Sequence, residues 1–452
     1  DNSEKLKTTN TFSALSQRFI EYGAFVGRGD STKVFVELGF LQRQNDSLQN
    51  NRIDRVNHSN SYYLKSQLIK TEKSNLSVFL NYRTLKYEDS NLKDEPSLNS
   101  RILYSDRFFG QLLQTTTAYE TSSGTIAQQE FTYLQVEPGQ GVYMWNDYNG
   151  NGIQELQEFE IAPYPDLAIY VRVFLPNQVF VRTHQNKFSQ SVNINFNQWQ
   201  NEKGFKKFAS HFYNQTSFLI DRKIRRNGSN FDLNPFSKEE EALIGLNTNF
   251  ISSLFFNRGK QHHSTTYSFL FNESQNLLSV GSVSAKNLSH QLQYQHLVDK
   301  SWLFNFSGSK TLTNSTSENY PTRNFEIDSY QIEPKIGYLF SKNASWDIFY
   351  EFQQKENKIG AFEILKQTRL GTSFTFNSEK GFSMNGEFSM YNNLYDGNAL
   401  SAVGFQMLEG LQPGKNQTWR LLLQKNLTQF LDLNINYQGR NSETSKTIHT
   451  GN

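Results

Sequence analysis

A twelve-residue stretch of acidic and amide side chains carries the clearest chemistry in this sequence. From Asp147 it reads DYNGNGIQELQE, and every fixed position of the calcium-loop pattern D-x-[DN]-x-[DN]-G-x5-E is filled. Ca²⁺ prefers roughly six to eight oxygen ligands, and short side chains at alternate positions supply them round one point. The spacing therefore predicts a calcium site, whose ligands are Asp147, Asn149, Asn151, Ile153, Glu155 and Glu158.

These ligands have distinct expected roles. Ile153 would offer its backbone carbonyl, Glu155 would bind directly or through water, and Glu158 would close the site with both oxygens. Long outward loops lack a hydrophobic core of their own, so a bound ion would hold this loop in a single conformation. The alternative is a metal-free surface turn rich in Asn and Gly. The terminal Glu158 favours the metal.

Catalytic chemistry has weaker signals. His211, His262, His263, His290 and His296 are candidate bases, but no Ser or Asp stands at a recurring motif spacing from them. His290 and His296 fall on an otherwise apolar strand face, where an interfacial histidine is the simpler interpretation. H-E-x-x-H, G-x-S-x-G and phosphate-binding glycine loops are absent from the sequence. We therefore predict no enzyme, and a barrel-borne hydrolase stays as an alternative.

Composition excludes several classes of function. The chain has 452 residues, no cysteine, and 45 basic against 43 acidic residues. Thiolate metal sites and disulfides are thereby excluded. A net charge of +2 without a basic block gives no electrostatic footprint for nucleic acid.

Apolar residues recur with period two along the whole chain. Phe382, Met384, Gly386, Phe388 and Met390 fall on one face of a strand, with polar residues between them. Aromatic residues make up 14% of the chain although hydrophobic residues make up only 36%. This combination is typical of an outer-membrane wall, with lipid on the apolar face and water on the other. A large soluble antiparallel protein is the alternative.

Short turns and long loops alternate between the predicted strands. Tight turns are expected at 71–75, 122–124 and 201–204, and long loops at 46–58 and 273–286, among others. We read about eighteen strands and predict an all-β transmembrane antiparallel β-barrel with short periplasmic turns and long extracellular loops. Residues 1–137 and 185–452 would form barrel strands, and 138–184 an extracellular insertion with the calcium loop. By strand parity a closing strand should follow residue 452, in a longer protein of about 20 or more strands.

Two segments carry a family resemblance. Residues 139–183 (GQGVYMWNDYNGNGIQELQEFEIAPYPDLAIYVRVFLPNQVFVRT) and the tail from 407 to 452, with its IHTG sequence, resemble the C-terminal barrel regions of large outer-membrane proteins of Bacteroidota. The resemblance implies location in the bacterial outer membrane and a metal-bearing surface loop. It implies no defined activity.

Three functions stay open. The first is an accessory barrel in a multiprotein envelope machine, for secretion, barrel assembly or a surface complex, whose insertion contacts other outer-membrane proteins or surface lipoproteins. The second is a channel or transporter, although no charge ladder is evident at lumen-facing positions. The third is the hydrolase. Membrane lipid is an expected partner. The basic stretches 221–226 and Lys206–Lys207 are expected to contact lipopolysaccharide phosphates or an acidic partner, or else to be solvated strand ends.

Overall fold

A computed structural model gives the structure of the chain. It describes residues 13, 16–30, 33–49, 52–89, 91, 93–226, 228, 230–237, 242–260, 262–278, 281–378, 381–427 and 431–451. The acidic run 238–241 and the turn residues 31–32 and 428–430 lie outside this part of the chain. Among the described residues no helix is long and apolar enough to cross a membrane.

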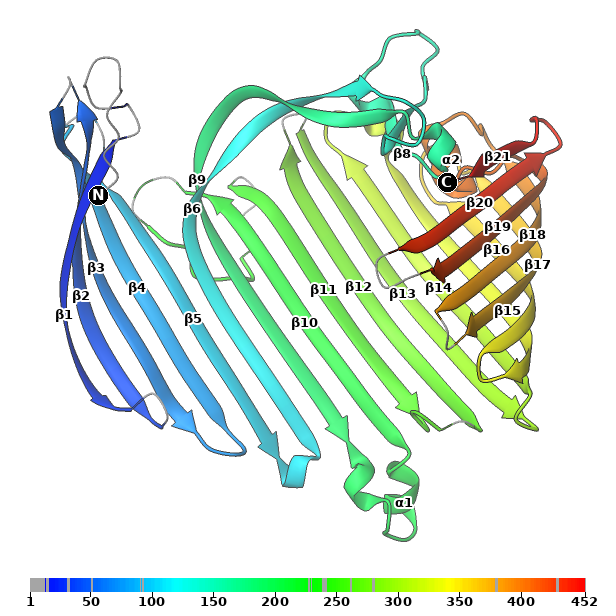
Figure 1. Ribbon diagram of the computed structural model, residues 1–452, viewed down its shortest axis with the longest axis horizontal. Coiled ribbons are helices and arrows are strands. Elements are labelled where there is room, and N and C mark those ends of the chain that lie inside the picture. Colours follow the sequence, from blue (N-terminus) through cyan, green and yellow to red (C-terminus); the bar gives the residue numbers. More distant parts are fainter. Residues whose placement is uncertain are drawn as a thin grey trace. The chain divides into compact units, whose positions relative to one another are not determined.

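The described residues form one 21-stranded antiparallel sheet, which confirms the predicted all-β fold class (Figure 1). The strands are β1 (Gln17–Gly29), β2 (Phe35–Gln49), β3 (Arg52–Lys70), β4 (Asn75–Tyr87), β5 (Glu95–Phe108), β6 (Leu113–Gln135), β7 (Tyr143–Trp145), β8 (Phe159–Ile161), β9 (Tyr170–Asn195), β10 (Phe212–Arg225), β11 (Leu243–Phe256), β12 (His263–Leu278), β13 (Gly281–Val298), β14 (Trp302–Ser317), β15 (Phe325–Ser341), β16 (Ala344–Asn357), β17 (Ile364–Ser378), β18 (Phe382–Asp396), β19 (Gly414–Asn426), β20 (Asp432–Ser442) and β21 (Ile448–Gly451).

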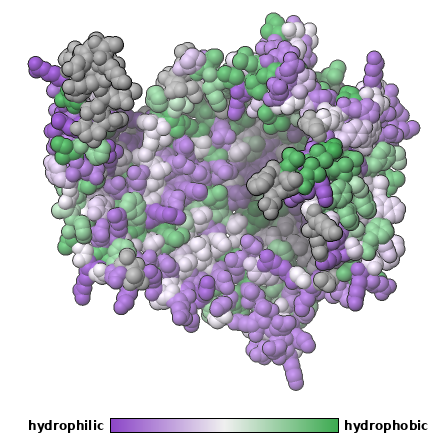
Figure 2. All heavy atoms as spheres, viewed as in Figure 1, coloured by the Kyte–Doolittle hydropathy of each residue, from purple (hydrophilic) through white to green (hydrophobic). Residues whose placement is uncertain are grey.

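Short helices lie in the connections. The α-helices are α1 (Phe205–Ala209) and α2 (Ala402–Leu408), and the 3-10 helices are η1 (Phe109–Gln111), η2 (Leu156–Glu158), η3 (Pro165–Leu167), η4 (Phe196–Trp199) and η5 (Pro321–Arg323). Figure 2 shows hydrophilic residues gathered over α1 and its neighbours, at the foot of the view.

The period-two pattern of the sequence becomes two different strand faces. In β15, Tyr330, Ile332 and Ile336 are 46%, 47% and 47% exposed. The residues that point to the other face between them, Gln331, Glu333 and Lys335, are only partly exposed. The paired strand β16 repeats this pattern, with Trp346 and Ile348 exposed on the same face. Because side chains alternate across a strand, one face of this part of the sheet is apolar and the other polar.

Two compact units contain these strands. The first comprises residues 1–127, 180–194 and 216–248, and the second comprises 128–179, 195–215 and 249–452. The loop 147–158, for which calcium binding is predicted, belongs to the second unit together with the segment around it. That unit also contains β12 to β21.

Several predicted turns are wrong, because polar sequences continue as strands. Residues 122–124 lie inside β6, and the real turn is η1. Ser123 bonds the backbone of Leu98 across the sheet, which satisfies its hydroxyl without a turn. The loop expected at 273–286 is mostly strand, since Glu273 pairs with Lys286 at 2.8 Å across β12 and β13. Cross-strand ion pairs of this kind stabilise strands whose composition resembles a loop.

Other predicted boundaries also move. Strand β9 begins at Tyr170, so the end of the expected insertion 138–184 belongs to the sheet. Residues 201–204 join η4 to α1 instead of forming a tight turn. The loop expected at 46–58 is largely taken up by β2 and β3. The eighteen predicted strands correspond to β1–β6 and β9–β20, and the structure adds the short strands β7, β8 and β21.

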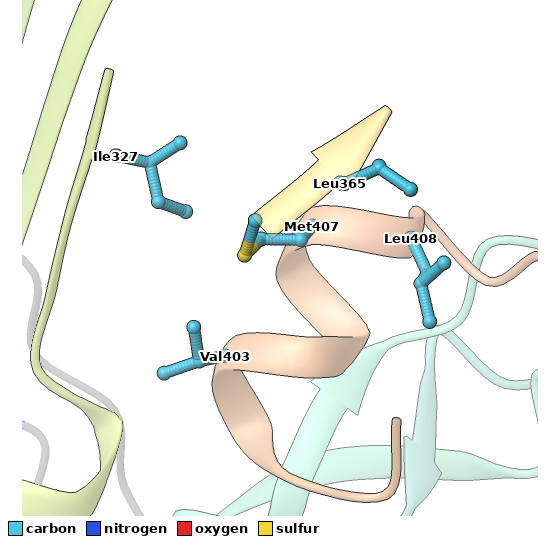
Figure 3. Packing of buried hydrophobic residues seen from close by; sticks show 5 residues of the cluster. All are labelled: Ile327, Leu365, Val403, Met407 and Leu408. Carbon is cyan, nitrogen blue, oxygen red and sulfur yellow. The ribbon is translucent and has the colours of Figure 1, made fainter. Parts of the chain in front are cut away.

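A small apolar core lies beneath helix α2. Val403, Met407 and Leu408 pack with Ile327 of β15 and Leu365 of β17 (Figure 3). The hydroxyl of Ser401 accepts a hydrogen bond from the backbone N–H of Gly404 and caps the helix. Its apolar residues hold the helix over β15 and β17, and these two strands also have polar side chains on one face.

Candidate functional site

The loop at 147–158 is shaped by its own side chains. Asp147 Oδ1 accepts a hydrogen bond from the Gly150 N–H at 2.8 Å, and Oδ2 accepts one from the Gly152 N–H at 2.8 Å. Asn149 and Asn151 make the same kind of turn with the N–H groups two residues further on. Gly152 has φ of 71°, a conformation that glycine adopts without strain. The predicted ligand positions are therefore brought together by local hydrogen bonds.

The two glutamates close the loop. Glu155 accepts hydrogen bonds from the side-chain amides of Asn149 at 2.8 Å and Gln157 at 2.5 Å. Glu158 is 1% exposed, and its Oε2 accepts a hydrogen bond from Trp145 Nε1 at 2.8 Å. Its other oxygen, Oε1, is buried without a hydrogen-bond partner in the described chain.

The donor set fits a hard dication. Asp147, Glu155 and Glu158 bring three carboxylates to one short loop, and Asn149 and Asn151 add amide oxygens. A buried carboxylate oxygen without a partner carries a desolvation cost that a cation would remove. Each carboxylate oxygen of Glu158 has two lone pairs, so Oε2 can bind a cation and keep its hydrogen bond from Trp145. The side chain of Ile153 is 63% exposed, which leaves its expected role to the backbone carbonyl.

An aromatic core supports this loop. Phe159 is 6% exposed and stacks on Tyr133 with ring centroids 4.0 Å apart. Tyr143 and Tyr170 contact the same pair at 5.0 Å, edge to face. The expectation that the insertion lacks a core is therefore wrong, because strands β7 and β8 pair over the ends of β6 and β9. Sequence reasoning missed this core since its residues are spread over 133–170.

Two ion pairs fix the insertion to the rest of its unit. Arg440 of β20 donates to both carboxylate oxygens of Asp166 at 2.7 Å and lies 4.0 Å over the Tyr164 ring. Hydrogen bonds from Arg440 hold the pKa of Asp166 below its ordinary value. On the other side, Arg323 donates to Glu160 at 2.6 Å. Burial raises the pKa of Glu160, and the Arg323 guanidinium opposes that rise.

The insertion also packs against helix α2. A cavity of about 210 Å³ is lined by Asp147, Tyr148 and Leu167 of the insertion and by Leu400, Phe405 and Leu408 near the helix. Figure 1 shows β8 next to α2. Burial raises the pKa of the Tyr148 hydroxyl. One side of the loop 147–158 thus faces a partly apolar pocket.

Sequence reasoning also missed a charge network on the polar face of β15 to β18. Arg369 bonds Glu351 at 3.3 Å and Glu387 at 2.5 Å, while Lys335 lies 3.9 Å from Glu333. That lumen-facing positions lack a charge ladder stays a prediction, and Arg369 with its two glutamates forms a charge cluster on the polar face of these strands. Glu351, Arg369 and Glu387 lie on three neighbouring strands, and strand register aligns them.

The candidate bases do not form a catalytic triad among the described residues. His290 bonds the Tyr267 hydroxyl at 2.8 Å on the apolar strand face. No sequence pattern singles out His184, which is fully buried with its Nδ1 3.1 Å from Ser123 Oγ. Ser123 is at the same time held by the backbone of Leu98, which fits a structural role.

The basic run 222–226 is partly buried. Arg222 is 1% exposed and bonds Asp232 at 2.6 Å, and Arg226 is 8% exposed with its guanidinium 4.9 Å over the Phe231 ring. Within this run, contact with lipopolysaccharide phosphates therefore stays a prediction for Lys223 and Arg225 only.

Comparisons with known proteins concern the fold. No family model and no curated protein matches the chain. Among solved structures it is similar to the FrpB iron transporter from Neisseria meningitidis, F5-1 variant, with 11% identity, a TM-score of 0.36, and 94% of this chain and 68% of that one covered. The outer membrane transporter YddB from Escherichia coli is 9% identical, with a TM-score of 0.30 and coverages of 97% and 73%. The siderophore receptor PirA from Acinetobacter baumannii is 9% identical, with a TM-score of 0.35 and coverages of 94% and 68%.

Proposed function

We propose that this chain is the wall of an outer-membrane β-barrel that acts as an accessory component of a multiprotein envelope complex. Its insertion, residues 136–169, would be the calcium-stabilised surface that contacts a partner protein. The observation that carries the proposal is the anchoring of this insertion through Asp166–Arg440 and Glu160–Arg323. A loop held by two ion pairs and by a core of its own has a defined conformation, so it can present a fixed surface to a partner protein.

The two strand faces support placement in a membrane. Aromatic and branched apolar side chains such as Ile332, Trp346 and Ile348 stand 45% or more exposed on one face. An exposed apolar face of this extent requires lipid or another apolar cover. Tight connections would then lie in the periplasm and the insertion outside the cell.

Calcium would act on the loop without a catalytic role. The buried Glu158 would lose the cost of its unpartnered oxygen when a cation binds. Neutralising three carboxylates would also remove their mutual repulsion within the loop. Chelation is expected to increase protease cleavage within 146–158 while cleavage elsewhere in the insertion stays slow. Equal cleavage with and without chelator would count against the ion.

Exposed apolar side chains mark the contact surface. Val142, Ile153 and Ile161 are 53%, 63% and 68% exposed on the insertion. Burying such residues against a partner would contribute about 1.5–3 kcal/mol for each large side chain. Protein contact accounts for their exposure better than contact with bare solvent does.

The test is purification of the native complex from outer membranes. We expect a stoichiometric partner to copurify with the unaltered chain and to be lost from the double variant Val142→Asp, Ile161→Asp, whose two positions lie outside the loop 147–158. The matched control is Phe205→Asp, which changes a 78% exposed aromatic residue in α1 at the other end of β9. A partner retained by the double variant, or absent from the unaltered protein, would reject the proposal.

A transporter is the second candidate, and the charge network around Arg369 favours it. Alternating charges on a polar strand face can order water and ions along a lumen. Planar-bilayer recordings should then show a conductance whose ion selectivity changes in Arg369→Gln. A protein that is silent in bilayers but keeps its partner would favour the accessory role.

A further inference from the structure

Three histidines meet at one corner of the sheet, away from the insertion. His263 opens β12 and is paired directly with His296 of β13. His262 precedes β12, and its carbonyl accepts a hydrogen bond from the Leu297 N–H at 2.9 Å. One ring nitrogen from each of the three imidazoles lies within 4.8 Å of the others.

We propose that His262, His263 and His296 bind a divalent transition-metal ion such as Zn²⁺, with a fourth position open to water. Imidazole nitrogen suits Zn²⁺, Ni²⁺ and Cu²⁺, whereas Ca²⁺ and Mg²⁺ take oxygen ligands. Zinc is bound in this way, by three protein ligands and a water molecule, at sites that keep an open coordination position. Small rotations of the rings would bring the nitrogens to the ~2.0–2.1 Å bond length that zinc requires.

The surroundings of the three imidazole rings support a metal-binding site. Nδ1 of His296 is buried without a hydrogen-bond partner in the described chain, although an imidazole nitrogen normally finds one. The His296 ring lies nearly parallel to that of Tyr294, with centroids 6.2 Å apart. His262 and His263 are exposed, so an ion can reach the cluster from solvent.

Asn257 supplies the support that metal-bound histidines usually have. It is 6% exposed, and its side-chain amide lies 2.7 Å from His263 Nε2 and 2.6 Å from His211 Nδ1. A metal-bound imidazole donates its second ring N–H to an oxygen acceptor. Half a rotation of the Asn257 amide would present its oxygen to a protonated His263 Nε2 and its nitrogen to an unprotonated His211 Nδ1, so both bonds survive when both rings exchange tautomers.

The experiment is a Zn²⁺ titration of the purified full chain in detergent, made without a histidine tag and followed by calorimetry. We expect one equivalent of zinc, and an affinity at least about tenfold lower in His263→Gln and in His296→Gln, because loss of an outer-shell partner alone costs about 10–100-fold. With Co²⁺ in place of zinc, the visible bands of a four-coordinate ion should appear and vanish in the same variants.

The control is His290→Gln, on the same face of β13 but bonded to Tyr267. It should bind zinc like the unaltered chain. Circular dichroism checks that every variant keeps its strands. Absence of tight zinc binding in the unaltered chain, or unchanged binding when all three histidines are replaced, would overturn the site.

Discussion

The insertion loop and the histidine corner gather their donors in opposite ways. In the loop, Asp147, Asn149 and Asn151 are neighbours in sequence and hydrogen-bond their own backbone. At the corner, His263 and His296 are 33 residues apart in the numbering and meet only through strand register. The first arrangement is local and oxygen-rich, and the second is non-local and nitrogen-rich. The two sites should therefore differ both in the metals they bind and in how far sequence can predict them.

The largest expected effect tests this difference in metal preference. Asp147→Ala removes a proposed carboxylate ligand and the acceptor of the Gly150 and Gly152 N–H groups. Calcium affinity should fall about 100-fold or more, since affinity follows ligand charge and loop rigidity. Zinc binding should stay unchanged. Calorimetric titration of each ion measures both.

A matched variant separates charge from shape. Asp147→Asn keeps an acceptor for the loop N–H groups but lowers the charge, so its calcium affinity should lie between those of Asp147→Ala and the unaltered chain. Loss of zinc binding in either variant would mean that the two sites are not independent.

The same contrast explains what sequence could predict. Alternation of apolar residues was sufficient to predict the all-β class, because successive side chains of a strand point to opposite faces. The loop pattern was sufficient to predict that Asp147, Asn149 and Asn151 lie close together, because each makes its turn with backbone only a few residues away. Register was not predictable, so the histidine corner and the Arg369 network stayed hidden. Turn positions failed at 122–124, where polar residues are satisfied across the sheet.

The second prediction concerns how the insertion is anchored. Arg440→Ala leaves Asp166 without its bidentate partner, and both side chains are mostly buried at 16% and 22% exposure. Docking of residues 162–169 should weaken by about 2 kcal/mol, the usual range for hydrogen bonds between charged groups. Hydrogen exchange of these amides measures the change. A double-mutant cycle with Asp166→Ala isolates the pair, and additive effects would show that it contributes nothing.

The third prediction compares two glycines. Gly152 has φ of 71° and open space where a Cβ would lie, whereas Gly124 has the same open space and an ordinary φ. Gly152→Ala should therefore lower the stability of the calcium loop by about 1–2 kcal/mol through backbone strain alone. Gly124→Ala should be close to neutral or mildly stabilising. Calcium-dependent protection against proteolysis measures the first, and equal effects at both positions would contradict the strain argument.

The smallest expected effect is the pH dependence of docking. Hydrogen bonds from Arg440 lower the pKa of Asp166 from its ordinary 3.8, so the docked state binds fewer protons there than the undocked state. The contribution of Asp166 to the free energy of docking is complete above its ordinary pKa, and it is lost as the pH falls through the lowered pKa. Burial raises the pKa of Glu160 above 4.5, which has the opposite sign. That contribution favours docking at lower pH and is lost as pH rises through the raised pKa.

Docking should consequently strengthen slightly as pH falls from 7 towards the raised pKa of Glu160, and weaken again below 3.8. Because the chain has no cysteine, dyes attached to Gln140→Cys and Lys446→Cys can follow the separation of the insertion from the β20–β21 connection by energy transfer. Asp166→Asn should remove only the weakening of docking at acid pH. Glu160→Gln should remove only the strengthening of docking as the pH falls from 7. If both limbs survive Asp166→Asn, the Arg440 pair does not govern docking, and the insertion is held chiefly by its aromatic core and by Arg323.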